Sequence, residues 1–523
     1  MMESSHFSPM KLFPITVSVA LWLFALPAWP LSGAEKSAWV GEEAGGKLTY
    51  KALPAGDRIM DFSWAGYGGG GVALPVVPVK KTVRPSGGDD TAMLQAALEE
   101  VGSLPAVNGL RGAVLMEAGR YQCSATLQMK TSGVVLRGSG SAAGGTVLEL
   151  IDKPHAAIAI SGSGGHQPVG EAVPVTDEYV PSGAVSFHVR DASSFKSGET
   201  ILIQRPATAA WVKFMGMDGL RRNGKEEHWV SGIIECERTV EAVAGNQITV
   251  SVPLADSLDA RYLNPPGATV VKASGGAFTA QVGIENLRIV SPPQKVAIDA
   301  PHHSGVRVKA ARDVWMKDLA IVDTVGSISF DGDSRCATVT GVSVEHNANT
   351  VGAAKPADFS ADGGQILFDR CTGKGDNLFY FVTGARVTGP NVVLNCTFHG
   401  NGHVQPHQRW AAGLLVDGCK VPEGGIDFMN RGEMGSGHGW TMGWAVAWNC
   451  EAETFTIQQP PGATNWAIGC RGQRVLAAMP FGKEPKLPEG IYDSHGTPVQ
   501  PVSLYLAQLR ARLGAQAVKN IGY

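Results

Sequence analysis

AGLLVDGC, residues 412–419, is a short apolar run that ends in Gly and Cys, and runs of this kind recur along the chain. Four further runs end with a cysteine at the same place, namely Cys371, Cys396, Cys450 and Cys470. Together with Cys419, these cysteines are separated by 25, 23, 31 and 20 residues. A repeat of this length made of short strands is typical of a β-solenoid, in which the strands of successive coils stack in parallel.

Related runs without the cysteine extend the pattern toward the N-terminus. GIENLRIV (283–290), MKDLAIVD (316–323) and VTGVSVEH (339–346) align with the same template. The longest separation, from Cys419 to Cys450, contains NRGEMGSGHGW, which we interpret as a loop inserted between two coils. The repeat therefore predicts one continuous stack of coils over this part of the chain.

The spacing of stacked strands decides how the five cysteines are interpreted. Equivalent residues of neighbouring coils lie one strand spacing apart, roughly 4.8 Å, with parallel Cα–Cβ vectors. A disulfide needs Cβ atoms nearer to about 3.8 Å and directed at each other. We therefore predict a buried ladder of thiols rather than a set of disulfides.

Composition and charge exclude some classes of partner. The formal net charge is −3, so the chain carries no global basic field for nucleic acid. Any anionic ligand must instead be held by a local patch of positive charge. Glycine accounts for 66 of the 523 residues, which favours tight turns and β-structure over helical bundles.

The N-terminus has the layout of a secretory signal peptide. Lys11 precedes the apolar run LFPITVSVALWLFALPAW, and Ser32 and Ala34 are the small residues before an expected cleavage after Ala34. No later stretch is long and apolar enough to cross a bilayer. We therefore expect a secreted or periplasmic protein with no membrane partner after cleavage.

The first part of the mature chain predicts a helix followed by strand-and-turn units. SGGDDTAMLQAALEEV (86–101) has Asp89, Asp90 and Thr91 at its start and an apolar face with helical spacing. It is followed by GAVLMEAGRYQCS and then by GVVLRGSG.

These segments carry a resemblance to a known family. A Gly- and Asp-rich turn, a capping helix, G-x-V-x-x-x-x-G-x-Y and G-V-x-L-x-G-x-G occur here over 87–91, 112–121 and 133–140. In this the chain resembles the pectate-lyase-like superfamily of right-handed parallel β-helix proteins, which includes polysaccharide lyases, glycoside hydrolases, phage tailspikes and epimerases. The resemblance implies an all-β fold, a right-handed parallel β-helix (solenoid) with an N-terminal capping helix, but it does not choose among these activities.

One segment interrupts the repeat. VSFHVRDASSFKSGETILIQR and RTVEAVAGNQITVSVPL alternate apolar and polar residues, which predicts an inserted antiparallel β-subdomain. The expected organisation is a signal peptide over 1–34, an N-terminal segment with the first coils over 35–164, the inserted subdomain over 165–272, the main coils over 273–475, and a C-terminal tail or cap over 476–523.

Polar clusters fall at comparable points of neighbouring repeats, which predicts one strip of functional side chains. The clusters are EHNAN (345–349), KGDN (374–377), HGNGHVQPHQR (399–409) and NRGEMGSGHGW (430–440). They supply as candidates His346, Asn347, Lys374, Asn377, His403, His407, Arg409, Arg431 and His438. An alternative interpretation is that the Asn and Gly residues only turn the corners of the coils.

The clusters give weak support for a metal site. His399, His403 and His407 are four residues apart, but Gly400, Gly402 and Pro406 argue against the helix that would align them. We therefore assign no zinc. The sequence leaves a calcium cofactor open, with Asp376, Asp358 and Asp362 as conceivable oxygen ligands.

The balance of bases and acids favours β-elimination over hydrolysis. An inverting glycosidase needs two carboxyl groups about 6.5–9.5 Å apart, for which Asp331, Asp333, Asp376 and Glu433 are the candidates. Elimination from a uronate instead needs a base for the C5 proton and a cation for the carboxylate. His407 and Arg409, two apart on an extended segment, offer both.

We therefore predict a secreted polysaccharide lyase that acts on an anionic, uronate-containing polysaccharide. His407 is the expected base and Arg409 binds the carboxylate, while His403, His438 and Tyr380 are further acid or base candidates. The residues expected to contact substrate are Asn347, His346, Lys374, Asn377, Arg431 and Trp440. A hydrolase with paired carboxylates and a non-catalytic glycan-binding β-helix are the alternatives, and the sequence specifies neither the polymer nor the oligomeric state.

Overall fold

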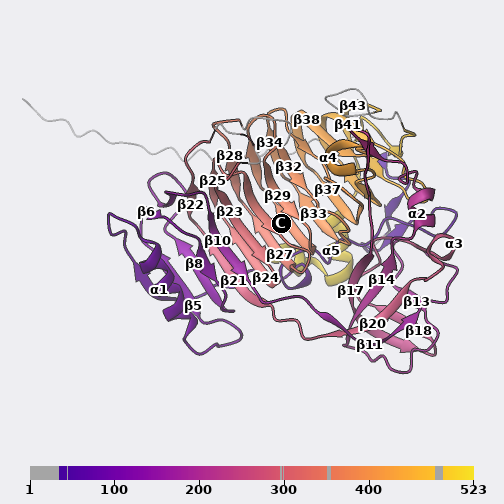
Figure 1. Cartoon of the computed structure of the whole chain (residues 1–523), viewed down its shortest axis with the longest axis horizontal. Coiled ribbons are helices and arrows are strands. Elements are labelled where there is room, and N and C mark those ends of the chain that lie inside the picture. The colour runs from indigo at the N-terminus through magenta and orange to yellow at the C-terminus, as the bar shows by residue number, and fades with distance from the viewer. Residues whose placement is uncertain (1–34, 44, 295–296, 298–299, 350–354, 477–486) are drawn as a thin grey trace, which may run out of the picture.

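The structure, a computed structural model, describes residues 35–43, 45–294, 297, 300–349, 355–476 and 487–523. The expected signal peptide over 1–34 lies outside these residues. The predicted all-β, right-handed parallel β-helix is confirmed, and its coils stack along the long axis of the molecule (Figure 1). No helix of the described segments is long and apolar enough to span a membrane.

Each coil contributes strands to three parallel ladders, which we call the first, second and third ladders. Within the described residues, the first ladder consists of β4 (Val79–Val83), β5 (Gly112–Met116), β8 (Val134–Gly138), β21 (Thr279–Glu285), β24 (Ala311–Lys317), β27 (Arg335–Thr340), β30 (Gly364–Asp369), β33 (Asn391–Leu394), β37 (Leu414–Asp417), β40 (Val446–Trp448), β42 (Trp466–Ile468) and β44 (Ile491–Asp493). The second ladder consists of β6 (Gly119–Cys123), β9 (Thr146–Leu150), β22 (Arg288–Val290), β25 (Ala320–Val322), β28 (Ser343–Glu345), β31 (Thr372–Lys374) and β34 (Thr397–His399).

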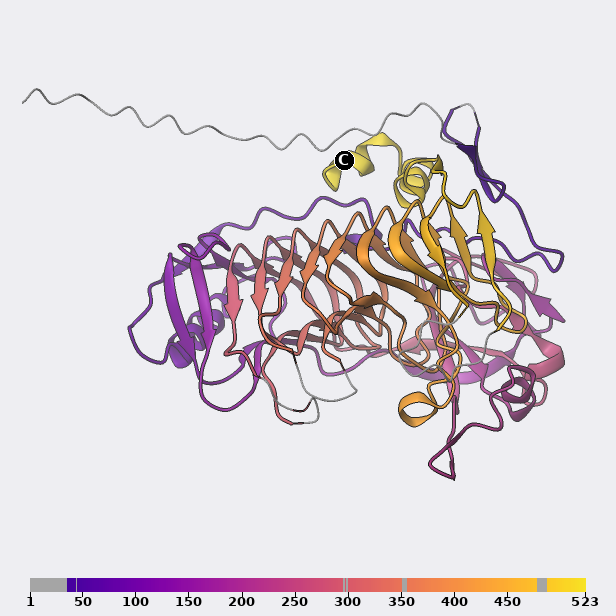
Figure 2. The same cartoon turned by 90° about the horizontal axis from the view of Figure 1, so that it is seen from above.

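The third ladder carries the candidate site. It consists of β7 (Leu127–Met129), β10 (Ala156–Ser161), β23 (Ser304–Lys309), β26 (Gly326–Phe330), β29 (Ala357–Ala361), β32 (Phe379–Val382) and β35 (His403–Val404). The second and third ladders merge in the longer strands β38 (Lys420–Phe428) and β41 (Glu451–Ile457), followed by β43 (Arg471–Arg474). Figure 2 shows the coils from above, side by side along the helix axis.

The corner between the first and second ladders explains the Asn, Asp and Gly residues of the repeat. One residue there adopts the left-handed backbone conformation in coil after coil, which Gly, Asn and Asp tolerate best. These residues are Asn286, Asp318, Gly341, Asn395, Gly418, Asn449 and Gly469, and Arg370 adopts the same conformation at the equivalent position of its coil.

The predicted thiol ladder directly follows this corner. Cys371, Cys396, Cys419, Cys450 and Cys470 are all buried, and the eight cysteines of the described chain are free thiols. Each thiol of the ladder donates to a backbone carbonyl of the preceding coil, as from Cys419 Sγ to Val393 O at 3.3 Å. Burial raises the pKa of Cys396, Cys419 and Cys470 well above its usual range, so these groups remain neutral thiols.

The N-terminal end of the core is closed by the predicted helix. Helix α1 (Thr91–Gly102) packs on β4, β5, β7 and β8. It buries Leu94, Leu98 and Val101 against the same apolar core that fills the coils. A β-helix must cover each open end, because the coil at that end would otherwise expose core side chains to water.

The inserted subdomain is an antiparallel sheet that lies beside the C-terminal coils (Figures 1 and 2). Its strands in the described chain are β11 (Gln167–Pro174), β20 (Thr269–Ser274), β14 (Thr200–Pro206), β17 (Ile233–Ala244), β18 (Gln247–Val250) and β13 (Ser186–His188). The short helices α2 (Ala209–Phe214) and α3 (Ala260–Leu263) belong to the same insertion.

Tryptophans join this subdomain to the coils. Trp229 of the subdomain donates to Trp440 O at 3.0 Å, and Trp440 Nε1 donates in return to Met215 O at 3.1 Å. Trp410 and Trp444 donate to the two oxygens of Asp256, at 2.7 and 3.0 Å. The indole rings are buried, so the interface resembles a second core rather than a loose contact.

A buried ion network connects the subdomain to the first ladder. Glu237 on β17 contacts the Arg312 guanidinium, and its carboxylate lies 3.0 Å from His166 Nδ1 and 3.6 Å from Arg335 Nε. Burial acts to raise the pKa of Glu237, but Arg335 and Arg312 outweigh it and lower the pKa to about 2. Glu237 is therefore a permanent negative charge between two arginines.

The outer side of the first ladder is covered by both terminal segments. The hairpin of β2 (Val40–Glu42) and β3 (Leu48–Tyr50) and the residues that follow it pack there with α5 (Leu504–Leu513) and α6 (Ala515–Asn520). Strand β1 (Glu35–Lys36) pairs with β45 (Val499–Gln500). The remaining short elements are η1 (Tyr67–Gly69), β12 (Tyr179–Val180), β15 (Arg221–Arg222), β16 (Lys225–Glu226), β19 (Leu258–Asp259), β36 (Ala411–Ala412), β39 (Met442–Gly443) and α4 (Met434–Gly437).

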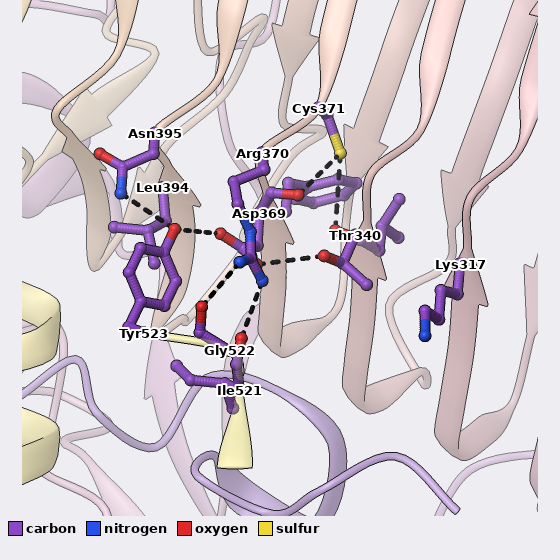
Figure 3. A network of polar contacts seen from close by, with 12 residues as sticks. Lys317, Thr340, Asp369, Arg370, Cys371, Leu394, Asn395, Ile521, Gly522 and Tyr523 are labelled. Atoms are coloured by element: carbon purple, nitrogen blue, oxygen red, sulfur yellow. Dashed lines mark hydrogen bonds and ion pairs between the residues drawn. The ribbon is translucent and has the colours of Figure 1, made fainter. Parts of the chain in front are cut away.

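The final residues are held by polar contacts at the edge of the first ladder (Figure 3). Arg370 donates to the carbonyls of Ile521 and Gly522, at 2.8 and 3.0 Å. The Tyr523 hydroxyl donates to Asp369 Oδ1 at 2.6 Å and accepts from Asn395 Nδ2 at 2.9 Å. These contacts fasten the C-terminal helices to two neighbouring coils.

A buried carboxyl group joins the C-terminal helices to the coils at a second point. Asp417, at the end of β37, accepts from Ser503 Oγ at 2.7 Å and from Tyr505 N at 2.8 Å, where α5 begins. Its side chain is fully buried, and burial raises the pKa of Asp417 from 3.8 to about 7. A carboxyl group with a raised pKa in the folded state favours folding at low pH, and that contribution is lost as the pH rises through the folded value.

We expect Asp417→Asn to be stabilised relative to the wild type as the pH rises from about 4 to about 7. The free energy difference should grow by roughly 1.4 kcal/mol per pH unit in this interval, because the carboxyl group ionises in the unfolded wild type but stays protonated in the folded one, so that folding must take up a proton. Urea unfolding of both proteins at several pH values measures it. Asp318→Asn on the surface is the control, and an equal slope for both variants would contradict the role of Asp417.

Candidate functional site

The candidate site lies on the outward face of the third ladder, where β35 continues as an extended segment. The backbone N–H of Gln405 donates to Phe381 O at 2.9 Å, and that of His407 donates to Thr383 O at 3.1 Å. Residues at alternating positions of an extended segment project to the same side. His403, Gln405 and His407 therefore form one row, and the site contains two of the predicted histidines.

His403 is oriented by a buried carboxylate from the next coil. His403 Nδ1 lies 2.6 Å from Asp427 Oδ2, and Gln405 Nε2 donates to the same oxygen at 2.8 Å. Asp427 is fully buried, whereas the His403 side chain keeps 26% of its surface exposed. An acceptor at Nδ1 places a proton on that nitrogen, so a neutral His403 presents a lone pair at Nε2, to which no described residue hydrogen-bonds.

Burial and the neighbouring charges set the pKa of His403. Burial, the largest influence, acts to lower the pKa of His403, but the Asp427 carboxylate more than offsets it and the pKa is raised above 6.5. Lys355 acts in the opposite direction. The pair of His403 and Asp427 is thus an oriented acid–base group at the surface of the ladder.

The close approach of His403 to β38 requires a glycine. A Cβ at Gly425 would lie 2.5 Å from His403 Nδ1 and 2.8 Å from Thr454 Oγ1. Both distances are shorter than van der Waals contact, so an added methyl group must displace the imidazole ring. Gly425 therefore allows His403 to reach Asp427.

Gly425→Ala is expected to displace the His403 ring and, for any reaction in which His403 transfers a proton, to lower kcat about 10²-fold, which is the effect of a displacement of about 1 Å at a reacting group. Its backbone φ is not left-handed, so the variant should fold. Steady-state rates and a melting curve test this together. The control is Gly144→Ala in the turn between β8 and β9, since a Cβ there meets nothing within 4 Å, and equal rates in both variants would contradict the positioning of His403.

His407 has a different environment, in which its Nδ1 lone pair is occupied. Arg431 Nη1 lies 3.0 Å from His407 Nδ1 and donates to His407 O at 2.9 Å. Because arginine only donates, His407 Nδ1 accepts, and its proton sits on Nε2. Burial and the Arg431 charge lower the pKa of His407 to about 3. A neutral imidazole with its free lone pair engaged is a poor proton acceptor, so this geometry favours His403 over His407 as the base.

The inserted loop adds His438 beside His407, and Arg409, two residues after His407, contacts the same loop. The rings of His407 and His438 have centroids 4.7 Å apart. Burial and the Arg431 charge, with smaller effects from neighbouring residues, lower the pKa of His438 to about 2. Arg409 donates to the backbone and side-chain oxygens of Ser436, which fixes the loop over β35.

Positive charge gathers around Phe379. The Arg431 guanidinium lies 5.5 Å and Lys355 Nζ 5.8 Å from the ring centroid, and the His407 ring lies 5.2 Å away. Phe379 pairs in register with His403 on the adjacent strand. Burial and the nearby Arg431 lower the pKa of Lys355. The site therefore combines an acid–base histidine with cations on a partly apolar floor.

Three of the predicted site residues lie in the interior. Tyr380 is fully buried and its ring stacks on Phe398 at 4.8 Å, so it belongs to the core. Trp440 is 3% exposed and packs against the inserted subdomain. His346 forms a buried pair with Asp358, its Nε2 lying 2.7 Å from Asp358 Oδ1.

The other predicted residues lie around the corners of the second ladder. Asn347 donates to Asp323 Oδ2 at 3.0 Å, and Lys374 lies 3.4 Å from Glu345. Asn377 has a left-handed backbone and donates its N–H to Asn401 Oδ1. These interactions match corner-turning roles, and the structure does not bring these three residues to the row of His403.

The conceivable calcium ligands are engaged by protein groups. Asp358 is paired with His346, Asp362 Oδ1 accepts from Gly384 N at 2.5 Å, and Asp376 Oδ1 accepts from Asn401 N at 3.1 Å. Among the described residues, no three His, Cys, Asp or Glu side chains are grouped so that they could hold a metal ion.

Sequence reasoning missed Asp427, Gln405, Lys355 and Gly425. Asp427 had a usable signal, because an acidic residue inside the apolar strand run GIDFM must be paired when it is buried. Gln405 also had one, since it alternates with His403 and His407. Lys355 and Gly425 had no such signal in the sequence, because their proximity to His403 depends on the register between coils.

No protein-family model and no curated protein matches the chain. Solved structures similar to it include the tailspike protein gp49 from Pseudomonas phage LKA1, with 15% identity and a TM-score of 0.43 over 73% of this chain and 56% of that one. The polygalacturonase from Erwinia carotovora ssp. carotovora has 12% identity and a TM-score of 0.35, over 83% and 96% of the two chains. The A-module of the Azotobacter vinelandii mannuronan C-5 epimerase AlgE6 has 12% identity and a TM-score of 0.33, over 79% and 96%.

Proposed function

We propose that the protein is exported and cleaves an anionic, uronate-containing polysaccharide by β-elimination on the third ladder. The observation that supports this best is the orientation of His403. Asp427 holds one ring nitrogen, at 2.6 Å, and leaves the other available for a proton beside the cations Lys355 and Arg431. A base next to positive charge is what removal of a proton from an acidic sugar requires.

In the proposed reaction, His403 Nε2 takes the C5 proton of the uronate. The electrons of the C5–H bond form the C4–C5 double bond, and the C4–O bond breaks. Lys355 returns a proton to the leaving oxygen, for which its lowered pKa makes it a better acid. Arg431 attracts the uronate carboxylate, whose negative charge otherwise opposes removal of the proton.

This assignment differs from the one expected from the sequence in two residues. His403 replaces His407 as the proposed base, because Arg431 occupies the His407 Nδ1 lone pair. Arg431 replaces Arg409 as the proposed carboxylate clamp, because its guanidinium lies over Phe379, the residue that pairs with His403, whereas Arg409 donates to Ser436 of the inserted loop. His407 and His438 remain as neutral groups that shape the site.

The hydrolase alternative has weaker support. It needs two carboxyl groups flanking the scissile bond. Asp427 is buried beneath His403 and Gln405 and serves to orient them, while the charge of the exposed Glu453 acts to raise the pKa of His403. Glu433 accepts from the backbone of Arg221 on the inserted subdomain.

The test is incubation with a panel of uronate polymers, such as polygalacturonate, alginate, hyaluronan and chondroitin sulfate. The expected result is a rise in ultraviolet absorbance from the unsaturated uronide, in step with new reducing ends. Reducing ends without that absorbance would indicate hydrolysis and overturn the proposal. Binding to a polymer without any product would indicate a non-catalytic glycan-binding protein.

A further inference from the structure

A second polar hollow lies on the third ladder, several coils upstream of His403. It is lined by Ser304 and Arg307 of β23, Ser329 of β26, and the flanking His302, His303 and Lys355. Arg307 pairs in register with Ser329, and Ser329 pairs with Ser360 of β29. The hollow is therefore part of the same surface as the His403 site.

The hollow and the candidate active site are continuous through β29 and β32. Ala357, which lines the hollow, pairs with Phe379, and Phe379 pairs with His403. Lys355 belongs to both places, because it lines the hollow and also lies over the Phe379 ring. A ligand that follows the ladder from the hollow reaches the active site without leaving the surface.

The hollow carries positive charge that the protein does not neutralise. No Asp or Glu belongs to its described lining. Arg307 is exposed and makes no hydrogen bond or ion pair with any described residue. An arginine fork without a protein partner is suited to a carboxylate or a sulfate group.

Buried polar atoms in the hollow also lack partners. Ser304 is 5% exposed, and its hydroxyl has no hydrogen-bond partner among the described residues. The same holds for His302 Nε2, while His302 Nδ1 contacts Ala300 O at 2.6 Å. Buried polar groups in folded proteins are nearly always satisfied, so these atoms indicate a place for a bound polar group.

The separation of the two sites sets the size of the ligand. Four strand steps lead from β23 to β35, which corresponds to roughly 19 Å at the spacing of neighbouring strands. One sugar cannot span this distance, whereas a segment of several sugars can. The arrangement thus fits an extended polymer that carries repeated negative charges.

We infer that this hollow is a distal subsite that binds an acidic group, carboxylate or sulfate, of a polysaccharide whose chain also occupies the His403 site. Arg307 and Lys355 supply the positive charge, and Ser304 and His302 supply hydrogen bonds. The inference rests on the proposed function for the class of polymer. It predicts that long chains are bound through a contact that short chains cannot make.

The test is affinity electrophoresis of the full mature chain in gels that contain polygalacturonate, chondroitin sulfate or chemically desulfated chondroitin. Retardation in such gels reports binding whether or not the polymer is cleaved. Arg307→Gln is expected to weaken retardation about tenfold or more, as apparent Kd, which is the effect of losing hydrogen bonds to a charged group. Dependence on Arg307 in both chondroitin gels assigns a carboxylate, and dependence in the sulfated gel alone assigns a sulfate.

The matched control is Lys317→Gln, which removes one positive charge from the first ladder, where Lys317 is half exposed. It should migrate as the wild type after correction in a gel without polymer. Equal retardation of the two variants, or no retardation of the wild type in any gel, would overturn the subsite. Failure of the proposed function looks different, since it would leave Arg307-dependent binding without unsaturated product.

Discussion

His403→Ala is expected to lower kcat on a uronate polymer by about 10²- to 10⁴-fold, the range for removal of a general base. The reason is that the Ala side chain has no nitrogen to accept the C5 proton, while Asp427 and Gln405 remain in place below it. Ultraviolet absorbance of the unsaturated product measures the loss. The wild-type rate should rise with pH as His403 loses its proton, with an apparent pKa above 6.5 because Asp427 raises it.

Two variants separate this expectation from a general effect on the site. His399→Ala changes an exposed histidine at the end of β34, 3.8 Å from Glu423, and should retain wild-type turnover. His407→Ala removes a neutral imidazole and should preserve the pH profile even if the rate falls. Full activity of His403→Ala, or a profile that follows His407 instead, would refute the assignment of the base.

Glu237→Gln is expected to destabilise the protein by about 3–5 kcal/mol, the range for removing one partner of a buried ion pair. The change leaves the Arg312 and Arg335 guanidinium groups close together without a counter-charge. Glutamine can still accept a hydrogen bond, but it cannot neutralise either arginine. The midpoint of urea unfolding, followed by tryptophan fluorescence, measures the loss, since buried tryptophans line the same interface.

Glu199→Gln provides the matched control within the inserted subdomain. Glu199 lies 3.0 Å from Lys272, but both side chains are about one-third exposed, so the expected loss is below about 1 kcal/mol. A similar midpoint for both variants would show that the buried network does not stabilise the docked subdomain.

The fold followed from the sequence because its signals are local and repeated. The left-handed corner before each cysteine is Asn or Gly in four of the five coils and Arg370 in the other, and the cysteine itself occupies a fixed inward position. The helix over Thr91–Gly102 and the alternation of the inserted strands are local in the same way. Each of these patterns could therefore be read without knowing how the coils face one another.

Less of the site could be predicted from the sequence, because the site depends on contacts between coils. His403, His407, Arg431 and His438 were found as candidates, and the structure brings them together. The sequence could not show that Arg431 donates to His407 Nδ1 or that Asp427 reaches His403, because each contact needs the register between strands. Burial of Trp440 depends on the docked subdomain, which a linear pattern does not encode.

The thiol ladder has a consequence for how such a chain can change its length. Because each rung hydrogen-bonds to the turn beneath it, a whole turn can be inserted or removed while the remaining rungs keep their neighbours. A shift by a single residue would instead point every side chain of the affected strand to the opposite face. Lineages with this architecture should therefore lengthen or shorten in increments of one complete turn, and the reach available to a bound polymer should vary in the same increments.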